Sequence, residues 1–230
     1  MSNKHFSENE QLSLDDIIRH RRDIRGNNFL NTPIEQDIND KILLSASLAP
    51  SVGYSQPWEF VLIEDEQTKA LIVDSHKRAN QRAAALYSDD KKSLYTQLKL
   101  EGIKESPINL AVFYKPSTQP VLGQHSMPEM GEYSVVCAIQ NMWLTARSLN
   151  IGMGWVSILD ADEVKTILNA PKEKKLIAYL CLGYVKEFFE IPELEQLNWQ
   201  SRKNLTIIKE KYSASEDENS YNHVTNNTIS

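Results

Sequence analysis

Three short segments of this chain carry residue types that bind or transform small molecules. The first is the RRDIR run at 21–25, in which Arg21, Arg22 and Arg25 surround Asp23. Guanidinium groups bind phosphate through charge-assisted hydrogen bonds, and a carboxylate within reach of a substrate proton can act as a general acid or base. Two plainer interpretations stay open. Basic residues near a helix C-terminus also offset the helix dipole, and Asp23 can be only their ion-pair partner.

The second and third segments are rich in small residues. Residues 49–58 read APSVGYSQPW and place serines beside a glutamine in a loop, and residues 152–157 read GMGWVS. Loops of small polar residues often carry ligand contacts, and glycines let the backbone approach a flat ligand closely. Both segments are equally compatible with ordinary turns. Neither GxGxxG nor GxxxxGK[ST] occurs, so neither a Rossmann dinucleotide site nor a P-loop is indicated.

The composition favours a globular domain over a nucleic-acid binder or a membrane protein. The chain has 230 residues, 41% of them hydrophobic, with 25 Lys and Arg against 31 Asp and Glu, a net charge of −6. A general nucleic-acid binder needs a basic face. The apolar runs are shorter than the ~20 residues that span a bilayer, and the first ten residues are polar, so we expect a soluble cytoplasmic protein.

The cysteines and histidines do not form a metal-binding pattern. Cys137 and Cys181 have apolar neighbours and no CxxC partner, so we expect both to be small core residues. The histidines lie scattered at positions 5, 20, 76, 125 and 223. We therefore predict no metal site.

The elements that must position the three segments alternate between helices and strands. Apolar spacing predicts helices over 14–22, 37–49, 66–102, 133–149 and 160–168, and β-prone runs predict strands over 58–63, 108–114, 154–158 and 177–184. The helix over 133–149 is apolar on several sides, so we expect it to be deeply buried. Asp160 and Glu163 have the spacing of a capping box. The interleaving predicts an α/β or α+β fold, a sheet covered by helices.

The two ends of the chain differ from the middle in composition. Residues 1–11 and 212–230 are polar and contain few large apolar side chains. Such segments cannot bury enough surface to offset their chain entropy. We therefore expect one domain over 12–211 between two polar tails, the C-terminal one disordered.

Taken together, the three segments resemble the FMN-dependent nitroreductase superfamily, which has an arginine-rich start, PSxxxxQPW and a late glycine-rich strand in the same order. The resemblance is closer still to its BluB branch, the 5,6-dimethylbenzimidazole synthases, and spans about residues 12–202. Six blocks carry it: RRDIR (21–25), APSVGYSQPW (49–58), MPEMGEYSVVCAIQNMWL (127–144), GMGWVSILD (152–160), AYLCLGY (178–184) and PELEQLNW (192–199). It implies an α+β nitroreductase-like fold, with a mostly antiparallel sheet flanked by helices, in an intertwined homodimer.

The chemistry that this resemblance implies is unusual. Ordinary nitroreductases recycle FMN as a hydride carrier, whereas the BluB branch consumes it. Reduced FMN, supplied by a separate flavin reductase, reacts with dioxygen and is broken down to 5,6-dimethylbenzimidazole, the lower ligand of vitamin B12, and erythrose 4-phosphate. Two other functions stay open: an NAD(P)H-dependent reductase of nitro or quinone compounds, and a non-catalytic flavin-binding module.

The resemblance also assigns residues. Asp23 and Ser157 match the two polar residues of the chemistry, and Arg21, Arg22 and Arg25 would hold the FMN phosphate. The full set of implied flavin contacts is Arg21, Arg22, Asp23, Ile24, Arg25, Ser51, Tyr54, Ser55, Gln56, Lys99, Gly154, Trp155 and Ser157. Tyr54 replaces the asparagine of many nitroreductases, so a backbone contact would substitute for that side chain.

Two further expectations concern the surroundings of the site. The polar segment 79–102 is predicted to be a lid, because of its length and position, and a closed site would exclude water. Neighbouring arginines should lower the pKa of Asp23, whereas burial should raise it. The sequence leaves open which effect is larger.

Overall fold

The structure is a computed structural model and describes residues 3–207 and 222–224. Its centre is a four-stranded sheet in which all neighbours are antiparallel. The strands, in spatial order, are β1 (Trp58–Ile63), β2 (Ile108–Tyr114), β4 (Lys175–Gly183) and β3 (Gly152–Val156). The two central strands are nearly continuous apolar runs, as expected for strands covered on both faces.

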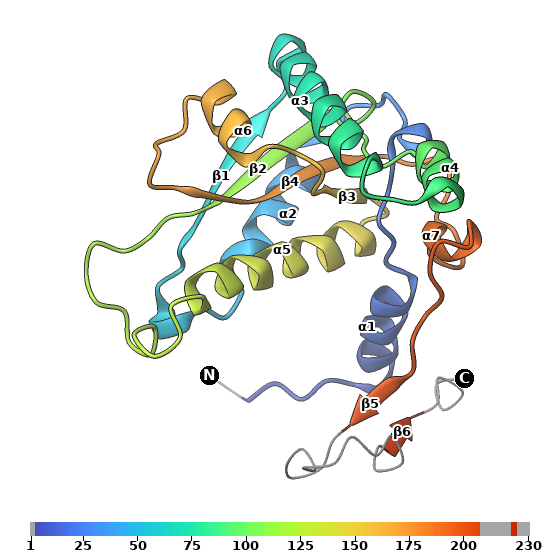
Figure 1. Cartoon of the computed structure of the whole chain (residues 1–230). Helices are drawn as coiled ribbons and strands as arrows, with labels where there is room; N and C mark the ends of the chain where they lie inside the picture. The colour runs from blue at the N-terminus through green and yellow to red at the C-terminus, as the bar shows by residue number, and fades with distance from the viewer. Residues whose placement is uncertain (1–2, 208–221, 225–230) are drawn as a thin grey trace, which may run out of the picture. The chain divides into compact units, whose positions relative to one another are not determined.

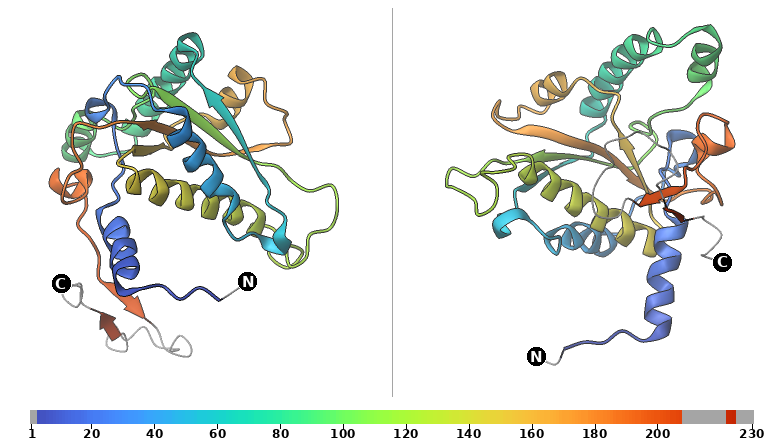
Figure 2. Two further views of the ribbon diagram at one scale, coloured as in Figure 1. Left: turned by 180° about the vertical axis from the view of Figure 1, so that it is seen from behind. Right: turned by 60° about the horizontal axis from the view of Figure 1, so that its bottom comes forward.

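Helices cover both faces of this sheet (Figures 1 and 2). On one face lie α2 (Gln36–Ser47) and α5 (Met130–Ser148), whose buried side chains join Leu110 and Val112 of β2 in one cluster. On the other lie α3 (Glu66–Ala84) and α6 (Ala161–Ile167), which pack on Ala111 and Phe113 of the same strand. Alternate residues of a strand point to opposite faces, so β2 serves both clusters. The predicted α+β fold with a helix-covered sheet is confirmed.

The N-terminal helix starts earlier than the sequence analysis predicts. α1 spans Glu8–His20, because Ser7 and Glu10 form a capping box: Ser7 Oγ accepts from the Glu10 amide, and the Glu10 carboxylate accepts from the Ser7 amide. The last four residues of the predicted tail over 1–11 are therefore helical. The helix ends at His20, so the RRDIR segment follows it as extended chain rather than as its last turn.

The single helix predicted over 66–102 is wrong. The structure has α3, a break at 85–88, and then α4 (Asp89–Gln97). Ser88 is the N-cap of α4, a position that serine favours because its side chain competes with the helix for backbone groups. Tyr95 Oη donates to Asn80 Oδ1 over 2.6 Å, so α4 docks on α3.

Two further expectations need correction. The predicted strand over 154–158 is shifted: β3 ends at Val156, where its pairing with β4 stops, so 157 and 158 lie outside the sheet. Cys181 is buried, but Cys137 is exposed, because α5 buries only the face that meets the sheet and α2. The remaining apolar face of α5 includes Tyr133 and Val136, which are also exposed.

The cap of α6 is confirmed in part. Asp160 is its N-cap and accepts from the amides of Asp162 and Glu163. The carboxylate of Glu163 bonds Ser75 and Arg78 of α3 instead of returning to the cap. This tertiary contact takes the place of the predicted reciprocal bond.

Residues from Ile191 onward form a second compact unit of their own. It contains α7 (Glu193–Gln196) and a two-stranded antiparallel pair of β5 (Leu205–Ile207) and β6 (Asn222–Val224). The predicted C-terminal tail over 212–230 lies outside the described residues except for β6, so its disorder stays a prediction. Within the described ranges, no helix combines the length and apolar character needed to cross a bilayer.

Candidate functional site

The RRDIR and GMGWVS segments meet at the edge of the sheet. The chain at 21–25 runs beside β3, with a parallel bridge between Asp23 and Met153 and a bond from the Ile24 amide to the Met153 carbonyl (3.1 Å). A Cβ on Gly154 would lie 2.0 Å from the Ile24 carbonyl oxygen, so only glycine admits this approach. At this position the glycine makes room for the protein's own backbone.

The carboxylate of Asp23 is fixed by two contacts and stays half-buried. Oδ1 accepts from the Trp155 amide over 3.0 Å, and Oδ2 lies 3.4 Å from Arg25 Nη2. The side chain keeps 38% of its surface exposed, so small molecules can reach it. Burial raises the pKa of Asp23 and outweighs the Trp155 hydrogen bond and the charges of Arg25 and Arg21, which lower it. The structure thus decides the question that the sequence left open.

Arg25 and Lys99 form a cationic corner beside this carboxylate. Arg25 Nη1 donates to the Lys99 carbonyl (3.3 Å), and only 11% of the Arg25 side chain is exposed. Lys99 Nζ forms ion pairs with Glu101 and Glu105. Burial alone would lower the pKa of Lys99, but its hydrogen bonds and ion pairs with these two acids raise it overall. Both side chains are cations that a phosphate or an electron-rich ring could approach.

Arg21 and Arg22 attach the segment to the rest of the protein. Arg22 is buried and donates to backbone carbonyls of Arg19, Arg21, Phe189 and Glu190. The Arg21 guanidinium lies 4.8 Å from the centre of the Trp143 ring on α5. Their role as phosphate ligands stays a prediction, because these contacts hold the segment in place whether or not a ligand is bound.

Ser157 lies at the same edge as Asp23. It follows the last residue of β3 and is exposed, and it lines a cavity of about 130 Å³ with Trp155, Leu159 and Tyr179, among others. It stands two positions after the Trp155 amide that binds Asp23, which is roughly 7 Å along an extended chain. The structure therefore places the two predicted chemical residues near each other.

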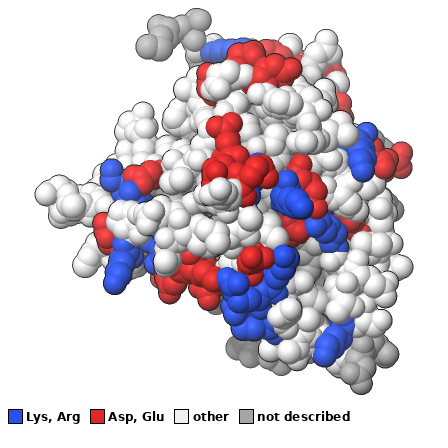
Figure 3. Space-filling view, turned by 90° about the horizontal axis from the view of Figure 1, so that it is seen from above, with Lys and Arg blue, Asp and Glu red and all other residues white. Residues whose placement is uncertain are grey.

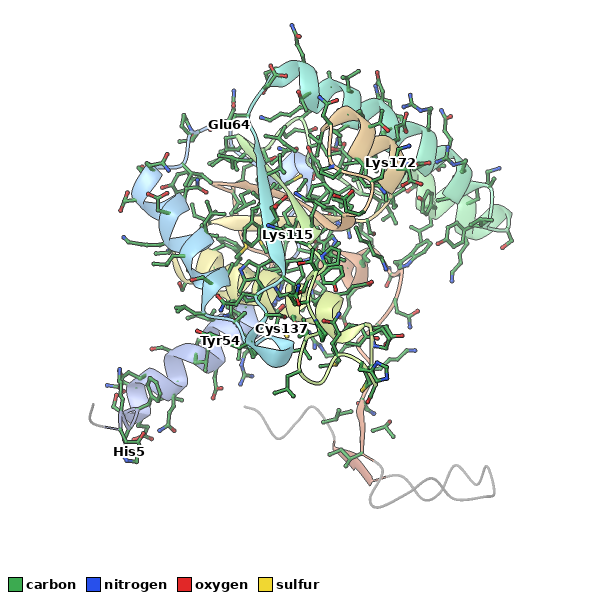
Figure 4. The ribbon with its side chains drawn as sticks, turned by 90° about the vertical axis from the view of Figure 1, so that its left-hand side faces the viewer. His5, Tyr54, Glu64, Lys115, Cys137 and Lys172 are labelled. Atoms are coloured by element: carbon green, nitrogen blue, oxygen red, sulfur yellow. The ribbon has the colours of Figure 1, made fainter. Side chains whose placement is uncertain are left out.

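The loop predicted to line the flavin has a strained backbone. Gly53, Tyr54 and Gln56 all have positive φ (54°, 54° and 46°), which costs energy for the two residues with a Cβ. The loop is closed by a bond from the Gln56 amide to Ser51 Oγ (3.0 Å). Tyr54 is 80% exposed and points away from the protein (Figure 4). Strain of this kind is typical of ligand-binding loops.

Ser55, in the same loop, has an unsatisfied hydroxyl. Among the described residues, its Oγ and Glu105 Oε2 are the buried side-chain atoms without a hydrogen-bond partner. Buried polar groups are nearly always paired, so such an atom indicates a missing ligand or water. The observation fits a ligand-lining role for the loop.

The loop and the Asp23 corner lie at different places along α5. Near its start, Ser134 Oγ accepts from the Val52 amide (3.0 Å), and nine residues later Trp143 Nε1 donates to the Arg22 carbonyl (3.2 Å). Nine helical residues rise by ~14 Å. Within a single chain, the two groups of residues that the sequence analysis assigns to one ligand therefore lie apart.

A buried histidine beside the site was not singled out from the sequence. His76 Nδ1 lies 2.9 Å from the carbonyl oxygen of Ile158, next to Ser157. Burial lowers the pKa of His76, with opposing contributions from the Ile158 carbonyl and Glu101. The available signal was its spacing: position 76 continues the buried face of α3 that Ile72 and Ala79 define.

Comparisons with known proteins cover most of this chain. The profile of the Nitroreductase family matches residues 18–184, which contain the whole sheet and the site. A 5,6-dimethylbenzimidazole synthase of Rhodospirillum rubrum is 44% identical over 198 residues, covering 85% of this chain and 93% of the relative.

Two solved structures share the fold. A BluB-like flavoprotein from Clostridium difficile superposes with a TM-score of 0.62 at 23% identity, covering 80% of this chain and 96% of the other. An iodotyrosine deiodinase bound to FMN and 3-iodo-L-tyrosine gives a TM-score of 0.69 at 22% identity, covering 86% of this chain and all of the other. The profile match and the 44% identical relative show that this chain belongs to the nitroreductase family.

Proposed function

We propose that this chain is a 5,6-dimethylbenzimidazole synthase, which uses dioxygen to break reduced FMN into 5,6-dimethylbenzimidazole and erythrose 4-phosphate. The observation that carries the proposal is the carboxylate of Asp23, which is half-buried, has a raised pKa and bonds the Trp155 amide at the sheet edge, two positions before Ser157. The 44% identity with a synthase of this name over most of both chains supports it. A flavin reductase of separate origin would supply the reduced FMN.

The residues on the page fit a flavin. Arg25 and Lys99 are cations at one side of the site, and Ser55 offers a buried hydroxyl without a partner in the described structure. An FMN-bound relative with the same fold supports this ligand class. When bound, reduced FMN would supply the electrons for the reaction with dioxygen and the ring that is broken.

Asp23 would move protons in this reaction. The Trp155 amide holds its Oδ1 and Arg25 Nη2 lies 3.4 Å from its Oδ2, so the carboxylate would be held in place to take a proton from the substrate's ribityl chain and return it to a leaving group. A pKa raised by burial makes the carboxylate a stronger base than an ordinary aspartate. Ser157 would orient the reacting atoms through its exposed hydroxyl.

A complete site would need two copies of the chain. The loop at 51–56 and the Asp23 corner lie ~14 Å apart along α5, so two antiparallel copies would bring one group from each chain to the same ligand. The exposed apolar side chains of α5 supply a surface for such a pairing. We infer a homodimer with each flavin between the protomers.

The test is incubation of the purified protein with FMN, a flavin reductase, NADH and air, followed by mass spectrometry for 5,6-dimethylbenzimidazole. We expect product in proportion to FMN consumed. Ser157→Gly should still consume reductant but release hydrogen peroxide with little product, because the hydroxyl that orients the reacting atoms is then absent. Recovery of intact FMN after many aerobic turnovers of the wild type would refute the proposal. Steady NADPH oxidation with a nitroaromatic and no added reductase would favour a nitroreductase instead.

A further inference from the structure

Ser157 lies where the sheet no longer determines its position. The last paired residues are Val156 of β3 and Tyr179 of β4, so the backbone at 157–160 is set by contacts outside the ladder. Within the segment, the Leu159 amide donates to the Ser157 carbonyl over 3.0 Å, which forms a local turn. A turn alone does not fix the direction in which the segment leaves the strand.

Helix α3 supplies the contacts that fix the direction in which the segment leaves the strand. Three of them act at the far end of the segment, on Asp160 or on Glu163 just beyond it in α6: Ser75 Oγ donates to Glu163 over 2.7 Å, Arg78 pairs with Glu163, and Arg82 pairs with Asp160 at 3.5 Å. Arg78 and Arg82 are more than half exposed. Figure 3 shows one face of the molecule, on which charges of both signs are interspersed. Exposed ion pairs of this kind contribute little to rigidity.

The contact of His76 is of a different kind. The imidazole is buried, with 6% of the residue exposed, and it bonds the carbonyl of Ile158, the residue next to Ser157. A carbonyl oxygen can only accept, so Nδ1 carries the proton and donates. A buried, nearly ideal 2.9 Å bond to one backbone atom restricts the peptide that links Ile158 to the next residue.

We propose that His76 is a positioning residue: its bond to the Ile158 carbonyl orients the backbone so that the Ser157 hydroxyl faces the substrate. As far as Ser157 acts in catalysis, the inference rests on the proposed function. His76 itself does not touch the reacting atoms in this account. It determines the orientation of Ser157 and therefore the product of the reaction. It does not determine the affinity for flavin.

Three variants test this role. His76→Leu introduces an apolar side chain of comparable size and removes the donor. His76→Asn keeps a donor close to the position of Nδ1. Ser75→Ala is the matched control, because it deletes a hydrogen bond from the adjacent residue of α3 to the far end of the same segment.

The first measurement needs no flavin. In the ligand-free protein, amide hydrogen exchange at 157–160 should become about tenfold faster in His76→Leu and stay near the wild-type rate in His76→Asn and Ser75→Ala. Unchanged exchange in His76→Leu would overturn the proposal. This arm is valid even if the wild type forms no benzimidazole, so a failure of the proposed function is distinguishable from a failure of this inference.

The second measurement is the ratio of benzimidazole formed to FMN consumed, with the FMN dissociation constant. We expect His76→Leu to lower the ratio about tenfold or more while the dissociation constant changes by less than about twofold, and His76→Asn to restore it. A loss of the same size in Ser75→Ala would show general loosening and overturn the proposal. Should His76→Leu not fold, His76→Gln serves instead, because its longer side chain displaces the donor without removing polarity.

Discussion

At the scale of single residues, burial rather than charge decides the chemistry of Asp23. Two arginines and a backbone amide all favour its ionised form, yet its pKa is raised because the surrounding protein removes water from the carboxylate. The same environment leaves part of the side chain exposed. A carboxyl with a raised pKa is a stronger base than an ordinary surface aspartate, which suits a group that transfers protons.

The raised pKa predicts an effect of Asp23→Asn on stability. A carboxyl with a raised pKa binds its proton more tightly in the folded state, so the protein loses stability as the pH rises from the ordinary value of 3.8 through the folded pKa. Asparagine carries no charge and avoids this loss. We expect Asp23→Asn to have a higher Tm than the wild type at pH 7.5, with a difference that disappears below about pH 3.8.

The same variant should lose activity but keep its ligand. Asparagine can still accept the Trp155 amide, so the local structure and FMN binding should persist, while benzimidazole formation should fall at least about a hundredfold. Calorimetry, flavin titration and product analysis on one preparation check all three statements. Full product yield from Asp23→Asn would remove this residue from the mechanism.

Arg25→Ala should weaken flavin binding. Loss of one charge-assisted hydrogen bond costs about 1–3 kcal/mol, which corresponds to a dissociation constant about 5- to 150-fold higher. Titration of oxidised FMN by fluorescence quenching measures this. Lys41→Ala, which removes an exposed cation paired with Asp37 on α2, is the control and should bind as the wild type does. An unchanged constant in Arg25→Ala would mean that Arg25 is not a flavin ligand.

At the scale of elements, the site depends on an extended segment that lies against the edge strand. The RRDIR segment follows α1, and its Ile24 amide donates to the Met153 carbonyl. This pairing places the Asp23 carboxylate where it accepts from the Trp155 amide. This close pairing is possible because position 154 has no side chain. The glycine is thus a structural requirement of the site.

Gly154→Ala should therefore separate the two segments. The added Cβ would overlap the Ile24 carbonyl at 2.0 Å, and relief of this overlap should cost about 1–3 kcal/mol of stability and most of the benzimidazole yield. Gly123→Ala is the control: its Cβ meets only an ordinary 3.6 Å contact, so the positive φ of 83° is its main cost. Denaturant unfolding and product analysis compare the two. Equal stability and yield in both variants would show that the segment tolerates the displacement.

The segment at 79–102 is a second element to test. It includes the end of α3 and all of α4, and Tyr95 holds the two helices together through Asn80. Lys99 and Glu101 lie at its end, beside Arg25. If this segment covers the ligand, amide hydrogen exchange at 85–102 should slow when FMN binds. Equal protection with and without FMN would exclude a lid there.

At the scale of the whole molecule, α5 has two apolar faces. A single chain covers only one of these two faces. Its inner face joins the core, while Tyr133, Val136 and Cys137 are exposed on its outer face. On α2, which packs beside it, Leu44 is 65% exposed, and Leu48, the C-cap of that helix, is 76% exposed. An exposed apolar surface of this kind is usually an interface.

A charge on this surface should break the assembly and the site together. We expect the wild type to elute as a dimer in light scattering and Val136→Glu to shift toward monomer with FMN affinity lowered about tenfold or more, because each flavin would lose the loop of the second chain. Leu71→Glu places the same charge on an exposed leucine of α3 and should change neither property. Tight FMN binding by a monomeric variant would contradict the shared site.

What the sequence determined by itself was whatever depends on neighbours along the chain. The strands at 58–63 and 108–114 have the predicted bounds, since continuous β-prone runs end at polar or turn residues, and the N-cap of α6 is read from Asp160 and its spacing. Resemblance to a family also directed attention to Asp23 and Ser157. These signals are local, or are inherited from a shared pattern of short motifs.

Only the tertiary structure decided what depends on contacts between distant segments. The approach of Ile24 to Gly154, the bond from His76 to Ile158 and the direction of the pKa shift at Asp23 each involve residues at least 80 positions apart or the burial of a group by several elements. Periodicity reports that a face is apolar, but not which surface covers it, as the exposed Cys137 shows. Burial and proximity are properties of the packed chain, and they determine the electrostatics of this site.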